Sequence, residues 1–380
     1  MSASAPSPRM RPFDMAKEYS HHPVGRCGLI YPGYLGLHHS VVRGFEAHGW
    51  QVDCWEPFYW HDLAPLSKIN YRIHQWVGRL ELYRISQKTA WFKRNAPRLR
   101  DTHYDLLVIL KGDWLTPEIM RAIRAATHAP IIVWAYDSTR RYPSIAEICR
   151  YADHTFIFEP EDAAHLMGTG CRSVSYLPVG FDDSAYHPAT SESKQDIDIF
   201  FCGKTTPGSR RYNYLARLCR EARTRGWNVL LALPAWSRIF GLLDWMRYHS
   251  DGMTAYIRNV ELRPDELCSF YHRAKICLNI HDEQSVRGYN PRTLDILAAG
   301  SLQLVDAKGQ ILQDFVPREV LATFDTEDDM IKRIQHYLDH SEERLDIAAR
   351  ARAMEKSHLS MRACVKQIIS MAFPGWDDAR

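Results

Sequence analysis

The chain has 380 residues, and its 48 lysines and arginines nearly balance its 45 aspartates and glutamates, which leaves a formal charge of +3 at pH 7. A chain of this length is typically divided into two or three domains, each able to bury a sizeable core. This near balance of charge argues against a protein whose whole surface is basic, as in many nucleic-acid-binding proteins. The nine cysteines include no C-x-x-C pair, so we expect buried thiols in a reducing compartment and neither disulfides nor a zinc site.

Residues 1–24 contain no apolar core of the kind that marks a secretory signal, and we expect them to form a disordered tail. No apolar run in the chain approaches the ~18 residues that cross a membrane as a helix. These features predict a cytoplasmic protein. Peripheral contact of the protein with the inner face of the membrane is an additional possibility.

Strand and helix signals alternate through residues 25–185. Strands are expected at residues 27–31, 51–55, 106–110, 131–135, 154–158 and 174–176, with helices near 37–48, 117–126, 143–151 and 161–167. This alternation favours a Rossmann-like domain, in which helices cover both faces of a parallel sheet. Ligands of such domains bind at the carboxyl ends of the strands.

The first of those strand ends leads into a turn that contains Gly33 and Gly36. A dinucleotide fingerprint would read G-x-G-x-x-G, which this turn does not. The turn is therefore either an ordinary tight turn or a place where the backbone approaches a substrate closely. His38 follows it at the start of a helix, where a histidine is more often a surface or capping residue; the alternative is a catalytic or acceptor-binding role.

Asp137 follows the expected strand at 131–135 directly. A carboxylate at the carboxyl edge of a parallel sheet is well placed to act as a general base. The simpler interpretation is an aspartate that begins a turn before Ser138. We keep Asp137 as the leading candidate for catalysis or substrate contact.

Residues 67–100 combine apolar residues at helical spacing with nine lysines and arginines and a single acid, Glu81. The simplest interpretation is a solvated amphipathic helix. The alternative is a surface that contacts anionic lipid headgroups or a lipid-linked phosphate. Nucleic acid is not expected as a partner, because the cations are confined to this one segment.

The polar stretch 182–195 predicts a boundary between the first domain, residues 25–185, and a second Rossmann-like domain, residues 186–345. Its strands are expected at residues 196–202, 228–233, 276–280, 302–305 and 320–324, with helices at 209–225, 263–273, 291–299 and from 327. Residues 346–380 are expected to continue as helix.

Cations follow the first strand of the second domain, at Lys204 and Arg210 beside Gly203. One interpretation is a phosphate cradle, in which the glycine admits close backbone approach and the cations neutralise the phosphate. The other is an ordinary basic loop. The pattern is not a complete P-loop, because Asp198 stands where the first glycine would be. Asp196 and Asp198 resemble a D-x-D metal signature but lie at the start of the strand, so no metal site is expected.

Residues 275–306 read as strand, polar loop, short helix and strand. Asn290 is expected to cap the helix with its side-chain oxygen, Pro291 fits the first helical position, and Gly300 ends the helix. The polar loop therefore opens at a helix N-terminus, where backbone N–H groups and the helix dipole favour an anion.

The amino-acid sequence of this segment resembles that of the C-terminal domain of GT-B glycosyltransferases, in particular CgeB-like (spore maturation protein-like) enzymes. The residues that carry the resemblance are Leu278, Asn279, His281, Gly288, Asn290, Arg292, Leu294, Asp295, Ala298 and Gly300. That family usually has glutamate where this chain has Asp295.

The resemblance implies an α/β protein of the GT-B class, with two facing Rossmann-like domains, parallel sheets and C-terminal helices that cross back to the first domain. It implies transfer of a sugar from a nucleoside-diphosphate sugar, with UDP as the first choice, to a saccharide or lipid-linked acceptor, with no metal and no further cofactor. Asp295 would accept hydrogen bonds from the ribose. The diphosphate and sugar would be held by Gly203, Lys204, Arg210, His281, Gly288, Tyr289, Asn290, Arg292 and Thr293.

Two other functions remain open on the same architecture. A nucleotide-sugar epimerase would need acid and base groups near the sugar and no acceptor. A non-catalytic protein would bind the nucleotide sugar without transferring or hydrolysing it.

Overall fold

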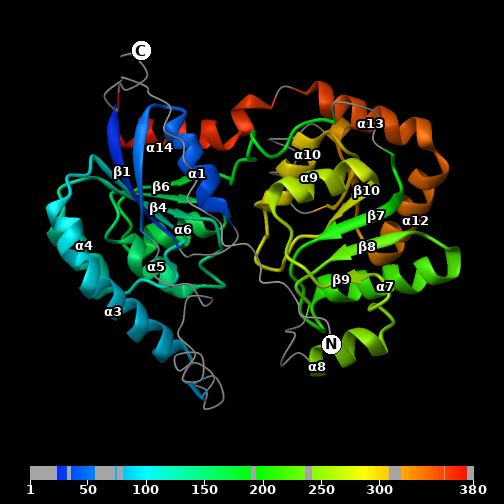
Figure 1. The fold of residues 1–380 in the computed structure, drawn as a ribbon, viewed down its shortest axis with the longest axis horizontal. Coiled ribbons are helices and arrows are strands. Elements are labelled where there is room, and N and C mark those ends of the chain that lie inside the picture. Colours follow the sequence, from blue (N-terminus) through cyan, green and yellow to red (C-terminus); the bar gives the residue numbers. More distant parts are fainter. Residues whose placement is uncertain are drawn as a thin grey trace, which may run out of the picture.

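The computed structural model describes residues 24–31, 36–55, 73–74, 80–189, 194–235, 242–307, 318–354 and 356–374. These residues form two parallel six-stranded sheets, each flanked by helices, that lie side by side along the long axis of the molecule (Figure 1). Residues 1–23 of the expected tail, Gly33 and most of residues 67–79 lie outside the described ranges.

The first sheet has the strand order β2-β1-β3-β4-β5-β6. Its strands are β1 (Gly25–Ile30), β2 (Trp50–Trp55), β3 (Leu106–Leu110), β4 (Ile131–Ala135), β5 (His154–Ile157) and β6 (Val174–Tyr176). Its helices are α1 (Leu37–Glu46), α3 (Leu80–Asp101), α4 (Pro117–Ala126), α5 (Pro143–Cys149) and α6 (Asp162–Gly168). The central strands β3 and β4 are buried along their whole length, as apolar strands covered on both faces should be.

The second sheet has the order β12-β11-β10-β7-β8-β9. Its strands are β7 (Ile197–Cys202), β8 (Val229–Ala232), β9 (Ile257–Arg258), β10 (Ala274–Asn279), β11 (Gln303–Asp306) and β12 (Ala322–Phe324). Its helices are α7 (Arg210–Arg225), α8 (Leu242–Ser250), α9 (Pro264–Arg273), α10 (Pro291–Ala299), α12 (Glu327–Asp339) and α13 (Ser341–Ala353).

The last helix, α14 (Met361–Ala372), packs against α1 of the first domain (Figure 1). Its apolar face joins the core that contains Val41 and Phe45. Gly44 permits this contact, since a Cβ atom there would lie 2.7 Å from Cγ2 of Val365. The helix expected over the C-terminal residues is therefore interrupted, because α13 packs on α10 of one domain and α14 on α1 of the other.

The apolar side of α3 is part of the core of the first domain, through Phe92 and Leu99. Its cations Lys93, Arg94 and Arg100 are exposed. No described helix combines the length and the apolar character that a membrane span requires.

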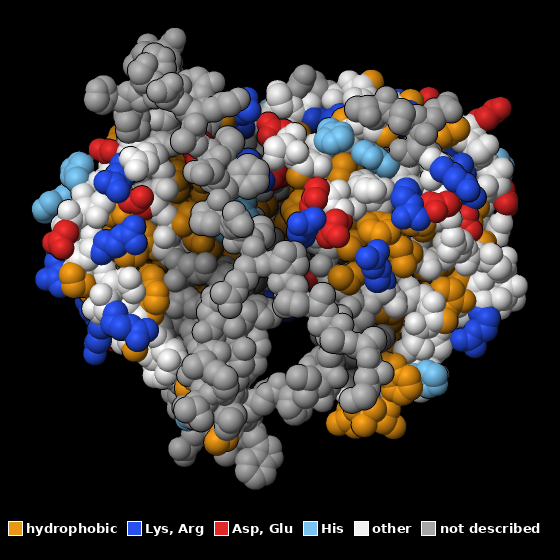
Figure 2. Space-filling view, viewed as in Figure 1, with side chains coloured by type: hydrophobic (Ala, Val, Ile, Leu, Met, Phe, Trp, Pro, Cys, Tyr) orange, Lys and Arg blue, Asp and Glu red, His pale blue; other side chains and the backbone are white. Residues whose placement is uncertain are grey.

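Four large apolar side chains are exposed together on α8 of the second domain. Figure 2 shows this apolar surface at the lower right of the molecule. It consists of Leu242, Leu243, Trp245 and Met246, while Tyr248 anchors the helix in the core.

Candidate active site

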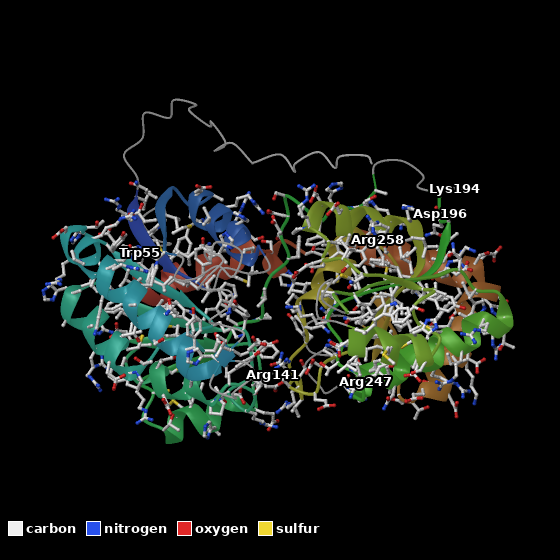
Figure 3. All side chains as sticks on the ribbon, turned by 60° about the horizontal axis from the view of Figure 1, so that its bottom comes forward. Trp55, Arg141, Lys194, Asp196, Arg247 and Arg258 are labelled. Carbon is white, nitrogen blue, oxygen red and sulfur yellow. The ribbon has the colours of Figure 1, made fainter. Side chains whose placement is uncertain are left out.

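Polar residues that follow the strands of the two sheets meet between the domains. Figure 3 shows Arg141, which follows β4 of the first domain, at the boundary with the second. Its Nη1 atom lies 3.3 Å from Oδ1 of Asp282, which follows β10 of the second domain. The carboxyl ends of the two parallel sheets therefore supply the residues of one interdomain region, as expected for a ligand site in such folds.

A cluster of arginines lies on the second-domain side of this region. Arg211, which the sequence did not single out, is buried; its Nε donates to the carbonyl oxygen of Ile280 at 3.0 Å and its Nη1 to that of Lys204 at 2.5 Å. Arg292 lies against the loop after β7, since a Cβ atom on Gly203 would be 3.2 Å from its Nη1. Burial, followed by the charge of Arg292, lowers the pKa of Arg211 to about 9. The guanidinium still carries its charge at neutral pH, so positive charge is concentrated here.

Two helices begin at this cluster, and both carry cations where helices usually carry acids. Ser209 caps α7 by accepting from the N–H of Tyr212 at 3.2 Å, and Arg210 and Arg211 occupy the first turn. The first turn of α10 contains Arg292, and neither first turn contains an acid. The positive end of a helix dipole repels cations and attracts anions. The two helix ends and their arginines are thus arranged to bind an anion such as a diphosphate.

Arg210 is oriented by a buried carboxylate that the sequence did not single out, Asp306 at the end of β11. Oδ2 of Asp306 accepts from Nη1 of Arg210 at 2.7 Å, and Oδ1 lies 2.7 Å from Nδ1 of His281. Burial alone would raise the pKa of Asp306, but the bonds from His281 and Arg210 outweigh it and hold that pKa well below its usual range. His281 is itself buried, so it supports Arg210 through Asp306.

A buried network of side-chain amides fixes the start of α10. Asn279 donates to Oγ1 of Thr293 at 3.0 Å and to Oε1 of Gln303 at 2.9 Å. Asn290 holds the N-cap position with extended backbone, but its side-chain amide donates to Oδ1 of Asn279 at 2.8 Å. The prediction that its side-chain oxygen caps the helix is therefore wrong, because the buried acceptor of Asn279 takes the amide group. Thr293, which was predicted to help hold the diphosphate and sugar, also belongs to this network, in which its Oγ1 accepts from Asn279.

Asp295 lies in the second turn of α10 and is partly buried. Burial raises its pKa to about 8, against the effect of the nearby charge of Arg292; a hydrogen bond with Tyr186 also lowers the pKa. In the ligand-free protein the carboxyl group is therefore largely protonated at neutral pH. A neutral carboxyl group can both accept from and donate to a hydroxyl group, so the role at a ribose that the resemblance implies stays a prediction.

Both carboxylate oxygens of Asp137 are engaged. Its Oδ2 lies 2.9 Å from Nζ of the buried Lys111, and its Oδ1 accepts from Nε2 of Gln284 in the second domain at 2.8 Å. Each carboxylate oxygen carries a second lone pair, so Asp137 can accept a proton from a substrate while it keeps these contacts. Its role as a base stays a prediction.

His38, at the start of α1, is buried and stacked on Tyr31 with ring centroids 4.0 Å apart. Burial, together with the neighbouring His39 and Arg43, lowers the pKa of His38 to about 4. The imidazole is therefore neutral at pH 7. Its Nδ1 has no hydrogen-bond partner in the part of the chain that the structure describes. Gly36 precedes the helix with φ of 67°, a conformation that favours glycine.

Gly288 and Tyr289 lie where the second domain touches the first. A Cβ atom on Gly288 would be 2.2 Å from the carbonyl oxygen of Phe158, so no other residue fits at this contact. The side chain of Tyr289 is buried. Gly288 thus allows the backbone of the second domain to approach the backbone of the first domain closely.

The acids of the D-x-D sequence are paired with cations. Asp196 lies 2.7 Å from Nη2 of Arg273, and Asp198 lies 2.7 Å from Nζ of Lys275. Over the described residues, no group of three His, Cys, Asp or Glu side chains is arranged to hold a metal ion.

Residues 210–370 match the protein family described as "Glycosyl transferase-like". The match runs from the first turn of α7 through α10 and into α14, so it includes the arginine cluster. No curated protein matches the chain.

Several solved structures share the whole two-domain fold. Sucrose-phosphate synthase from Thermosynechococcus elongatus has a TM-score of 0.62 at 12% identity, with 94% of this chain and 100% of that chain covered. HepE from Anabaena, in complex with UDP and glucose, has a TM-score of 0.61 at 11% identity, over 91% of this chain and 99% of that one. The lipopolysaccharide outer core galactosyltransferase WaaB has a TM-score of 0.53 at 14% identity, over 92% and 99%. The fold is thus the predicted GT-B fold, and with the family match it supports the predicted glycosyltransferase enzyme.

Proposed function

We propose that this protein transfers a sugar from a nucleoside-diphosphate sugar to a saccharide or lipid-linked acceptor, without a metal ion. The observation that carries the proposal is the arginine cluster at the N-termini of α7 and α10. Such an arrangement of fixed cations and helix ends fits a diphosphate. UDP is the first choice of nucleotide, since HepE, which has the same fold, has been seen with UDP and glucose.

Breaking the bond between the sugar and the diphosphate leaves negative charge on the departing phosphate. Arg211 and Arg292 would stabilise that charge in the transition state, together with Arg210 as oriented by Asp306. Lys204 and Gly203 belong to the loop that would lie along the phosphates, and Asp295 would contact the ribose.

The acceptor would bind on the side of the first domain. Here His38 offers a neutral imidazole, and Asp137 offers a carboxylate held by Lys111. Either can accept the proton of an attacking hydroxyl group. The motif between Leu278 and Gly300 favours a CgeB-like enzyme within the GT-B class.

The cations of residues 67–100 would serve a lipid-linked acceptor by attracting anionic headgroups. The exposed Lys93, Arg94 and Arg100 support this assignment. Arg79, Arg84 and Lys88 have side chains outside the described part of the chain. Flotation with vesicles should show capture by phosphatidylglycerol and not by neutral lipid, and the capture should weaken in salt. Equal capture by both vesicle types, or by neither, would assign the segment to an ordinary solvated helix.

A thermal-shift panel of UDP, GDP, dTDP, CMP and ADP sugars tests the proposed donor. A nucleotide sugar at ~100 times its dissociation constant should add about 2.7 kcal/mol to the free energy of unfolding. If none shifts the melting temperature, the donor site is wrong. Release of an epimerised sugar without acceptor would favour an epimerase, and binding without transfer or donor hydrolysis would favour a non-catalytic protein.

A further inference from the structure

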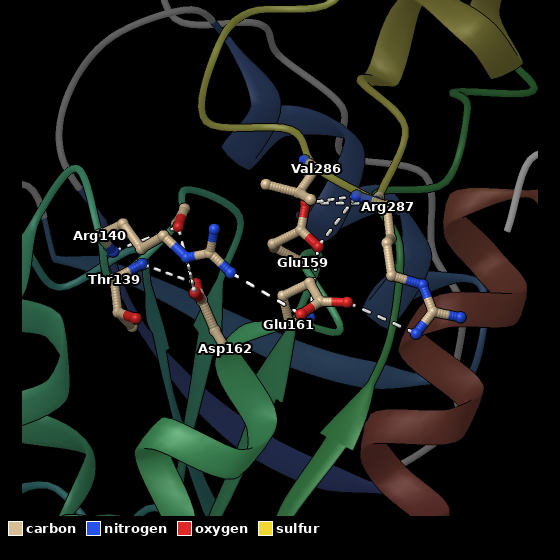
Figure 4. Close-up of polar contacts among 9 residues, drawn as sticks. Thr139, Arg140, Glu159, Glu161, Asp162, Val286 and Arg287 are labelled. Carbon is tan, nitrogen blue, oxygen red and sulfur yellow. Dashed lines mark hydrogen bonds and ion pairs between the residues drawn. The ribbon is translucent and has the colours of Figure 1, made fainter. Parts of the chain in front are cut away.

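Glu159 is a fully buried acid that the proposed reaction does not use. It follows β5 of the first domain; one partner, the backbone N–H of Glu161 at 3.3 Å from Oε1, lies in the same domain, and the others lie in the second. Oε2 accepts from the backbone N–H groups of Val286 at 2.7 Å, Arg287 at 3.2 Å and Gly288 at 3.1 Å. Figure 4 shows this carboxylate reaching the loop that leads into α10.

No ion pair of Glu159 with a cation occurs among the described residues, so backbone N–H groups carry the stabilisation of its charge. A buried carboxylate without such donors is costly, and so are buried N–H groups without an acceptor. When the domains separate, water can reach both partners. The contact therefore requires the two domains to lie together as they do in this structure, which we call the closed arrangement.

Other contacts hold the same loop from the same side. Gln284 bonds to Asp137, and Arg141 pairs with Asp282 at 3.3 Å. On the first-domain side, Asp162 fixes the turn after β4 by accepting from the N–H of Thr139 at 2.7 Å (Figure 4). The turn after β4 and the residues after β5 are thus hydrogen-bonded to each other and together form the surface against which the loop lies.

The loop ends four residues before a proposed ligand of the diphosphate. Gly288 is held by Glu159, Asn290 occupies the N-cap position of α10, and Arg292 lies in the first turn of that helix. We propose that Glu159 is a positioning residue that places the start of α10, with Arg292, for the donor, so that donor binding and domain closure favour each other. This inference rests on the proposed function, and the coupling must be reciprocal.

The first test is amide hydrogen exchange of the loop in the full-length protein. Glu159→Ala should speed exchange at residues 286–288 by at least about tenfold, because hydrogen bonds to a charged group are lost. Glu161→Ala is the matched control. Among the described residues, the side chain of this nearby exposed acid contacts the loop only through its pairing with Arg287 at 3.5 Å, so exchange should stay within about twofold. Unchanged exchange in Glu159→Ala would overturn the proposal.

The second test is the affinity for UDP-glucose by calorimetry. Glu159→Ala should weaken binding at least about fivefold, the lower end of typical coupling between sites, and Glu161→Ala should not. Glu159→Gln keeps one acceptor oxygen and should fall between wild type and Glu159→Ala. A merely structural residue would lower thermal stability and leave the affinity of the folded fraction unchanged, and that result would overturn the proposal.

The wild-type protein provides a test without any variant. Saturating UDP-glucose should slow exchange at residues 286–288 further, because the donor favours the closed arrangement. Exchange that stays the same or accelerates while UDP-glucose is bound would contradict the coupling. If the wild-type protein binds no nucleotide sugar, the proposed function fails, and the comparison of Glu159→Ala with Glu161→Ala alone decides whether Glu159 holds the loop.

Discussion

Asp295 should make the stability of the ligand-free protein depend on pH. Its pKa in the folded state, about 8, lies above the value near 3.9 of an exposed aspartate. The folded protein therefore binds more protons between these values, and the free energy of unfolding falls as pH rises from about 4 to about 8. Asp295→Asn mimics the protonated acid, so its melting temperature should fall less between about pH 5 and pH 8. Parallel pH profiles of the two proteins would contradict the raised pKa.

Asp295 should also contribute to nucleotide binding. Asp295→Ala should weaken UDP binding by roughly 1.5–3 kcal/mol if the carboxylate bonds to the ribose in its charged form, the range for hydrogen bonds to a charged group. Calorimetry on a variant that folds normally measures this. Unchanged affinity would remove Asp295 from the site.

The sequence predicts which acidic residues lie at strand ends, but it does not predict what each of them does. The argument that singled out Asp137, an acid directly after a buried strand, applies equally to Asp306 and Glu159. What the sequence does not reveal is their partners: Asp306 bonds to Arg210, 96 positions away, and Glu159 to Gly288, 129 positions away. Such pairings depend on how the two domains and their sheets come together.

The start of α10 should depend on its amide network. Asn279→Ala removes a donor and an acceptor that Thr293, Gln303 and Asn290 use inside the protein. Each buried polar group left without a partner costs about 1–3 kcal/mol. Urea unfolding of Asn279→Ala should therefore show a loss of several kcal/mol, while Asn213→Ala on the exposed face of α7 should change little. Equal stability of the two variants would show that the network does not hold the helix.

Strands and helices were largely predictable because local rules govern them. The fully apolar runs at β3 and β4 have the expected bounds, Leu106–Leu110 and Ile131–Ala135, and Gly300 ends α10 in the left-handed conformation at φ 70°. The break between α13 and α14 was not predicted. It arises because consecutive helices pack on different domains, which helical periodicity does not reveal.

For the whole molecule, activity should survive treatment with EDTA. The acids with the most metal-like spacing, Asp196 and Asp198, are neutralised by Arg273 and Lys275, and the proposed diphosphate contacts are arginines and helix ends. Sugar transfer measured before and after chelation tests this. Loss of activity that manganese restores would place the diphosphate at an acidic cluster instead.

The sequence predicts the two-domain architecture of the whole molecule, through the alternation of strands and helices and the resemblance at residues 278–300. The contacts between the domains did not follow, because they join loops with no regular pattern. Arg211 illustrates the limit: the sequence shows one cation in a basic loop, whereas the fold buries it beside Arg292 and gives it a role at the centre of the proposed site.

Calorimetric titration with UDP of the wild-type protein and of Arg292→Ala tests the central claim most directly. The account predicts that the wild type binds and that Arg292→Ala loses about 1.5–3 kcal/mol of binding free energy, as expected for a charge-assisted contact to phosphate. Arg263→Ala, an exposed arginine at the N-cap of α9 in the same domain, should bind like the wild type. Wild-type affinity in Arg292→Ala, or no binding of UDP to the wild type, would contradict a nucleotide site between α7 and α10.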